Sequence, residues 1–155
     1  MATSGGEREN RLMGVVAAEG RELEAIFGRI EAETTEPAER RRLADEILQR
    51  LAGHAAARRE VLYPRVSKDL PDGDSAVDLA LLGLDQIERT SKELADLSGA
   101  EPSFLPLVKK LATEVWEHLD EEEGEVLPAL VDAIGVDAAN ELGDKLAQAG
   151  ATAAR

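Results

Sequence analysis

Residues 118–128 read HLDEEEGEVLP, and residues 54–64 read HAAARREVLYP. Both segments begin with a histidine, have a long polar residue four positions later and end with a proline ten positions later. Residues four apart share one face of an α-helix, whereas a proline deletes a backbone donor and distorts the helix before it. The repeat therefore predicts two related helical hairpins, each with the motif late in its second helix and a distortion near Glu60 or Gly124.

Apolar residues around these motifs recur at steps of three and four, which is the period of an amphipathic helix. The four apolar stripes run through residues 12–30, 43–62, 77–97 and 107–126. Turn-forming clusters separate them at residues 35–37, 70–75 and 98–103. Connections this short join antiparallel neighbours. We therefore expect an all-α, up-down-up-down antiparallel four-helix bundle, with a short C-terminal helix over about residues 137–148.

The size and charge of the chain restrict the classes of function. Its 155 residues suit a single domain over 1–155, with a core at about 10–148 and frayed ends. The net charge of −14 repels nucleic-acid backbones and anionic membranes. The chain has no cysteine, no apolar stretch long enough to span a bilayer and no signal-like start. We expect a cytoplasmic protein without nucleic-acid or membrane partners, and its oligomeric state stays open.

Polar residues interrupt the second and fourth stripes where the core should lie. Extending the stripes through these gaps turns His54 and Arg58 inward from one helix, and His118 and Glu122 inward from the other. A histidine and a glutamate four apart can chelate a divalent metal such as Fe or Zn. Arginine cannot ligate, because it has no free acceptor, and it prefers to pair with a carboxylate. We therefore expect an Arg58–Glu122 ion pair across the bundle axis.

These motifs resemble the hemerythrin-like, HHE cation-binding domains. Residues 117–128 are similar to the family's fourth-helix signature, residues 19–27 resemble its first-helix segment, and the resemblance covers about residues 10–148. The family has a four-helix bundle that binds a non-haem di-iron centre. The resemblance implies one histidine ligand from each helix and a bridging glutamate from the second and fourth helices.

Only half of that ligand set is present in this chain. The family positions that are kept are His54, His118 and Glu122. The positions that differ are Gly20 at the first-helix histidine, Arg58 at the second-helix glutamate and Ile87 at the third-helix histidine. The resemblance therefore implies that the di-iron centre is lost, and we expect no resident cofactor.

The first functional hypothesis is a small organic molecule that is bound or transformed in the vacated cavity of the bundle. The expected pocket residues are Gly20, Tyr63, Ile87 and Ser91. The expected catalytic group consists of His54, Arg58, His118 and Glu122. In this hypothesis Arg58 holds an anionic group of the ligand, and a histidine or the glutamate serves as general acid or base.

Two alternatives belong to other classes. One is a single divalent metal, iron or zinc, held by His54, His118 and Glu122. Its difficulty is distance, because the two histidines serve different irons in the family, and Arg58 adds a repelling charge. The other alternative is a non-catalytic interaction scaffold, which predicts no pocket.

Overall fold

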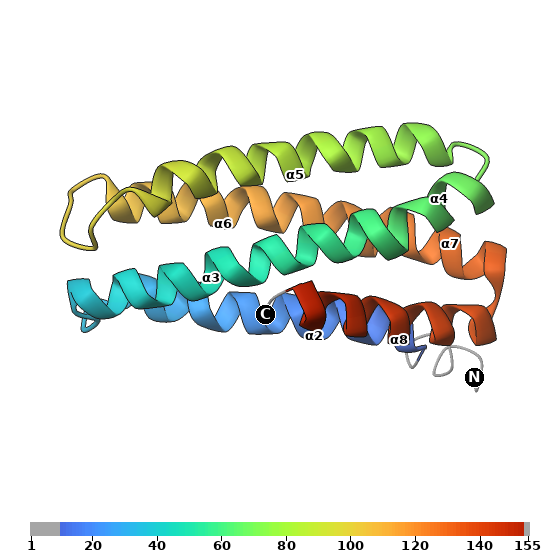
Figure 1. The fold of residues 1–155 in the computed structure, drawn as a ribbon, viewed down its shortest axis with the longest axis horizontal. Coiled ribbons are helices and arrows are strands. Elements are labelled where there is room, and N and C mark those ends of the chain that lie inside the picture. Colours follow the sequence, from blue (N-terminus) through green and yellow to red (C-terminus); the bar gives the residue numbers. More distant parts are fainter. Residues whose placement is uncertain (1–9, 154–155) are drawn as a thin grey trace.

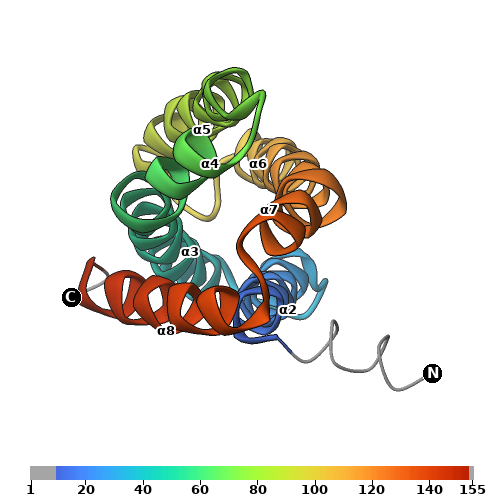
Figure 2. The same cartoon turned by 90° about the vertical axis from the view of Figure 1, so that its right-hand side faces the viewer.

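The computed structural model describes residues 10–153, and every regular element within that range is helical. Its helices are α2 (Arg11–Glu31), α3 (Pro37–Ala57), η1 (Arg58–Leu62), α4 (Tyr63–Asp69), α5 (Gly73–Ala95), α6 (Phe104–Glu121), η2 (Glu122–Val126), α7 (Leu127–Ile134) and α8 (Val136–Ala153). Four long rods, α2, α3 to α4, α5, and α6 to α7, surround one core (Figures 1 and 2). The predicted all-α bundle is confirmed. The fraying expected for residues 1–8 concerns residues outside the described range.

The helices begin and end where local chemistry favours it. The side chain of Asn10 caps α2 by accepting a hydrogen bond from the backbone N–H of Met13 at 2.9 Å. Pro37 opens α3 in the first turn, where its missing N–H costs nothing. Gly135 separates α7 from α8 with a φ of 88°, in a region that side chains rarely adopt.

The distortions expected before Pro64 and Pro128 are present as π-helical turns. The segments η1 and η2 cover the two expected positions, Glu60 and Gly124. At the end of η1 the N–H of Tyr63 bonds to the carbonyl of Arg58, five residues back, and η2 ends with the corresponding bond from Leu127. Such wide turns often occur at functional sites. Here each turn begins at one of the inward polar residues of the repeat.

The C-terminal helix α8 lies along the outside of α2 and α3 (Figure 2). It is longer than expected at both ends, and it buries Ala139, Leu142 and Leu146 against the bundle. Gly143 allows a close approach to α2, because a Cβ there would lie 2.5 Å from the backbone carbon of Arg11. Among the described residues, no helix is both long and apolar enough to cross a bilayer.

Candidate functional site

The four inward polar residues of the repeat meet in one buried layer at the bundle axis. Arg58 is fully buried, with a relative exposure of 0%, and His54, His118 and Glu122 are also buried. The guanidinium of Arg58 donates from Nε to Glu122 Oε1 at 3.1 Å and from Nη2 to Oε2 at 3.0 Å. The expected ion pair is therefore present as a two-point contact, which is the strongest geometry for these groups.

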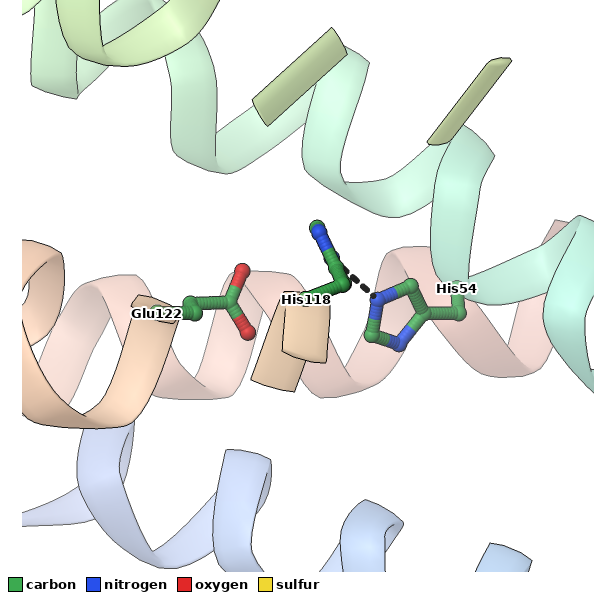
Figure 3. A group of neighbouring side chains, drawn as sticks. All are labelled: His54, His118 and Glu122. Atoms are coloured by element: carbon green, nitrogen blue, oxygen red, sulfur yellow. Dashed lines mark hydrogen bonds between the residues drawn. The ribbon is translucent and has the colours of Figure 1, made fainter. Parts of the chain in front are cut away.

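The two histidines lie much closer together than the family's ligand roles suggest. Figure 3 shows their rings meeting edge to face, and the Nε2 atoms of His54 and His118 are 3.2 Å apart. Both pairs in this layer, His54–His118 and Arg58–Glu122, join residues that are 64 positions apart. Equivalent positions of the two hairpins thus face each other across the axis, and the distance objection to a shared ion is wrong.

Glu19 of α2 completes the layer, although it was not among the predicted site residues. Its Oε2 accepts a hydrogen bond from His54 Nδ1 at 3.0 Å and lies 2.8 Å from Arg58 Nη1. With a proton on His54 Nδ1, the Nε2 atom of that ring is the acceptor, and His118 Nε2 is the donor between the rings. This hydrogen-bond pattern leaves His118 Nδ1 as an acceptor, and this atom lies beside Gly83 of α5.

The electrostatics of the layer favour neutral imidazoles beside an ionised pair. Burial, with a contribution from the Arg58 charge, holds the pKa of His54 well below its usual value of 6.5. Burial likewise lowers the pKa of His118. Burial alone would raise the pKa of Glu122, but the Arg58 charge and hydrogen bonds outweigh it and lower that pKa. Burial opposes the charge of Arg58, yet Glu122 and Glu19 together raise its pKa.

The donor set does not fit a di-iron centre. Arg58 lies where a second carboxylate would be needed, and it binds both oxygens of Glu122. One ion is a different matter, because donor atoms of His54, His118 and Glu122 all lie within 4.8 Å of one another. Two imidazoles on one tetrahedral zinc, at about 2.0–2.1 Å each, would place their nitrogens about 3.3 Å apart. The observed 3.2 Å between the Nε2 atoms is close to that spacing, so His54, His118 and Glu122 could hold one ion.

A cleft of about 490 Å³ lies beside this layer, between α5 and α6. Its lining includes Tyr63, Gly83, Glu114, His118 and Glu122. The Oη of Tyr63 and the Oε1 of Glu114 are buried without a hydrogen-bond partner among the described residues. A Cβ at Gly83 would lie 3.6 Å from His118 Nδ1, so the missing side chain leaves that nitrogen accessible from the cleft.

The structure does not bring the four expected pocket residues together. Tyr63 lines the α5–α6 cleft, whereas Ile87 and Ser91 line a separate cleft of about 300 Å³ that reaches His54. Gly20 of α2 faces Leu119 of α6 and Glu123 of η2. The space expected to be vacated by the metals holds the ion pairs of Arg58, and the clefts lie beside this layer.

Three residues of the site were missed, and each has a signal in the sequence. Steps that alternate between four and three residues from Leu12 lead through Val16 to position 19 and then to Leu23. Glu114 lies one turn before His118, on the face that already carries His118 and Glu122. Gly83 precedes Ile87 by four residues, so both lie on the inward face of α5. At Gly83 this face has no side chain.

Comparison with known proteins agrees with this architecture. The family model described as the hemerythrin HHE cation binding domain matches residues 14–130. A DNA nickase from Nostoc sp. (strain PCC 7120) is 24% identical over 129 residues, which is 83% of this chain and 36% of that protein. The chain thus spans about a third of that curated relative, and no solved structure matches it significantly. The chain belongs to the hemerythrin HHE cation-binding domain family.

Proposed function

We propose that this hemerythrin-family protein has exchanged the di-iron centre for an internal ion pair and binds a small organic molecule in the α5–α6 cleft. The observation that carries the proposal is the pair of unpartnered buried atoms, Tyr63 Oη and Glu114 Oε1, in residues that line the cleft. Buried polar atoms are nearly always hydrogen-bonded in folded proteins, so a ligand that bonds to them accounts for both. A volume of about 490 Å³ lies within the range typical of small-molecule sites.

The buried ion-paired layer fixes the positions of the side chains that line the cleft on its inner side. Arg58 holds the carboxylate of Glu122 in place, and Glu19 fixes the ring of His54. His54 in turn orients His118, so that Nδ1 of His118 is available to accept a hydrogen bond from a ligand. In this arrangement Arg58 positions other groups and does not itself line the α5–α6 cleft.

We do not extend DNA nicking to this chain from its Nostoc relative. The chain matches only about a third of that protein. Binding to DNA also depends on neutralising phosphates with lysine and arginine, whereas this chain has a net charge of −14.

The test is a ligand-observed NMR screen with a fragment library of small acids, amines and neutral aromatic compounds. We expect hits with the native chain and their loss in Gly83→Leu, because the added side chain fills the cleft next to His118. Gly28→Leu is the matched control, since Gly28 is an exposed helical glycine with open space around its Cβ position. Hits that survive Gly83→Leu would refute the location, and a screen without hits would favour the interaction scaffold.

A second candidate function is a single divalent metal site, and the 3.2 Å distance between the two Nε2 atoms favours it. The residues that would hold the ion are His54, His118 and Glu122, and Glu19 already makes the carboxylate contact to a ligand histidine that is common in metal sites. A bound ion would supply Lewis-acid chemistry. Elemental analysis of protein purified without chelators tests this candidate, and metal well below one equivalent per chain would end it.

A further inference from the structure

Most of the charged residues that line the α5–α6 cleft are acidic. The acidic residues in its lining are Asp85, Glu114, Glu117, Glu121 and Glu122, and its single basic residue is Arg89. Arg89 is already paired with Asp85, at 2.6 Å, and Glu122 is already paired with Arg58. Among the described residues, the remaining three acids make no ion pair, so the cleft carries uncompensated negative charge.

Glu114 differs from the other two unpaired acids because it is buried. Its exposure is 8%, and Oε1 has no hydrogen-bond partner in the part of the chain that the structure describes. Glu117 and Glu121 are exposed to solvent at the mouth. A buried carboxylate oxygen without a partner is costly unless something donates to it. Tyr63, at 5% exposure, adds a second unpartnered oxygen to the same lining.

The polar atoms of the cleft are suited to a donor-rich ligand. Glu114 Oε1, Tyr63 Oη and His118 Nδ1 can all accept hydrogen bonds. A protonated primary amine carries one positive charge and three N–H donors. An anion would instead face the unpaired acids. The guanidinium that was expected to hold an anion, that of Arg58, is occupied by Glu122 and Glu19.

One part of the rim, on α5, is apolar. Leu79 and Leu82 of α5 line the cleft, are 57% and 67% exposed, and lie three residues apart on one helix face. Ala76, Ala80 and Val126 extend the same wall. A ligand with an apolar body and one charged end would cover these leucines while its charged end reaches Glu114.

We propose that the α5–α6 cleft selects an organic amine, whose ammonium group bonds to Glu114 and whose apolar part packs on the exposed leucines of α5. This inference rests on the proposed function, because it names the ligand class for the same cleft. The feature that decides the class is the buried, unpaired carboxylate of Glu114.

The test compares three probes of similar size, which are 2-phenylethylamine, 2-phenylethanol and phenylacetate. Each is titrated into the full chain in EDTA, and binding is followed by the backbone amide shifts of Gly83 and its neighbours. Because a hydrogen bond to a charged group outweighs one between neutral groups, we expect the amine to bind about tenfold or more tighter than the alcohol. Phenylacetate should bind most weakly.

Charge-neutral variants locate the contact. Glu114→Gln should reduce amine affinity about tenfold or more and leave 2-phenylethanol binding unchanged. Glu93→Gln, which removes the same charge from an exposed position of α5 outside the cleft, should change neither. If Glu114→Gln does not fold, the backbone amide shift of Glu114 in the native chain replaces it, and this shift should change with the amine and not with 2-phenylethanol; equal changes with both would overturn the contact.

The outcomes separate this inference from the proposed function. Alcohol or phenylacetate binding at Gly83 as tight as that of the amine would overturn the amine selectivity and leave the cleft intact as a site. Equal losses in Glu114→Gln and Glu93→Gln would overturn the direct contact. A cleft that binds none of the probes, together with an empty fragment screen, would overturn both.

Discussion

Replacing Arg58 by methionine is the most direct test of the buried layer. Methionine keeps a long flexible side chain but removes the guanidinium, and with it two hydrogen bonds to Glu122 and the contact to Glu19. The carboxylate of Glu122 is 4% exposed and would then lie in the core without a counter-charge. Breaking a buried pair by removing one partner typically costs about 3–5 kcal/mol.

That cost is large for a chain of this size. For 150–250 residues, each kcal/mol of destabilisation lowers Tm by about 2–4 °C, so Arg58→Met should lower Tm by roughly 6–20 °C. Because replacing both partners by apolar residues is often neutral or stabilising, adding Glu122→Met should recover most of the loss. The pair should therefore show a strong favourable coupling in a double-mutant cycle.

Urea unfolding of the four proteins of this cycle, followed by circular dichroism, gives the required free energies. The matched control is Arg59→Met, since Arg59 forms an exposed ion pair with Glu88 at 2.8 Å, and such pairs contribute about 0–1 kcal/mol. If Arg58→Met costs no more than Arg59→Met, or if the double variant loses the sum of both single losses, the buried pair does not stabilise the fold as argued.

Three further predictions concern acid and two glycines. His54 and His118 have pKa values below the usual 6.5 in the folded chain. As pH drops below about 6.5, the unfolded chain therefore binds protons first, and the free energy of unfolding falls. Because the pKa of Glu122 is also lowered, this free energy falls further as pH drops below 4.5, the usual pKa of a glutamate. The urea midpoint should therefore fall with acid more steeply in the native chain than in His54→Gln/His118→Gln, and parallel profiles would contradict the histidine contribution. Gly135→Ala should cost about 1–3 kcal/mol, because the φ of 88° with ψ of 164° strains any side chain; an unchanged midpoint would mean that the α7–α8 turn relaxes freely. Gly143→Ala should cost about 1–3 kcal/mol by pushing α8 away from α2, and it should increase amide exchange in α8; normal exchange there would show that the contact adjusts locally.

Most of the fold follows from the sequence because its signals are local. The apolar stripes decide the helices, and the two prolines mark where the hydrogen-bond ladder must change. The Arg58–Glu122 contact was also predictable, because the 64-residue repeat places equivalent residues on facing helices. The form of the helix distortion was less predictable. A proline indicates that the backbone hydrogen bonds before it are disturbed, but not that they form a π-helical turn.

The site was predicted less well because a helix can rotate slightly about its axis without changing its stripe. A shift of one residue separates Gly20, which was expected at the layer, from Glu19, which contacts it. It is equally hard to predict between which helices a cleft opens, because this depends on where side chains are absent. Gly83 beside His118 opens the α5–α6 cleft. The pattern of either helix alone does not show that these two residues are neighbours.

The face-to-face placement of equivalent positions has a consequence for how such a chain diverges. His54 contacts His118, and Arg58 contacts Glu122, so each inward residue of one hairpin restricts which residue fits at the equivalent position of the other. Without metal cations between them, a charge reversal at position 58 would place two carboxylates face to face and would need a compensating change at position 122. Relatives that also lack the metal centre should therefore change at these two positions together, although 64 residues of chain separate them.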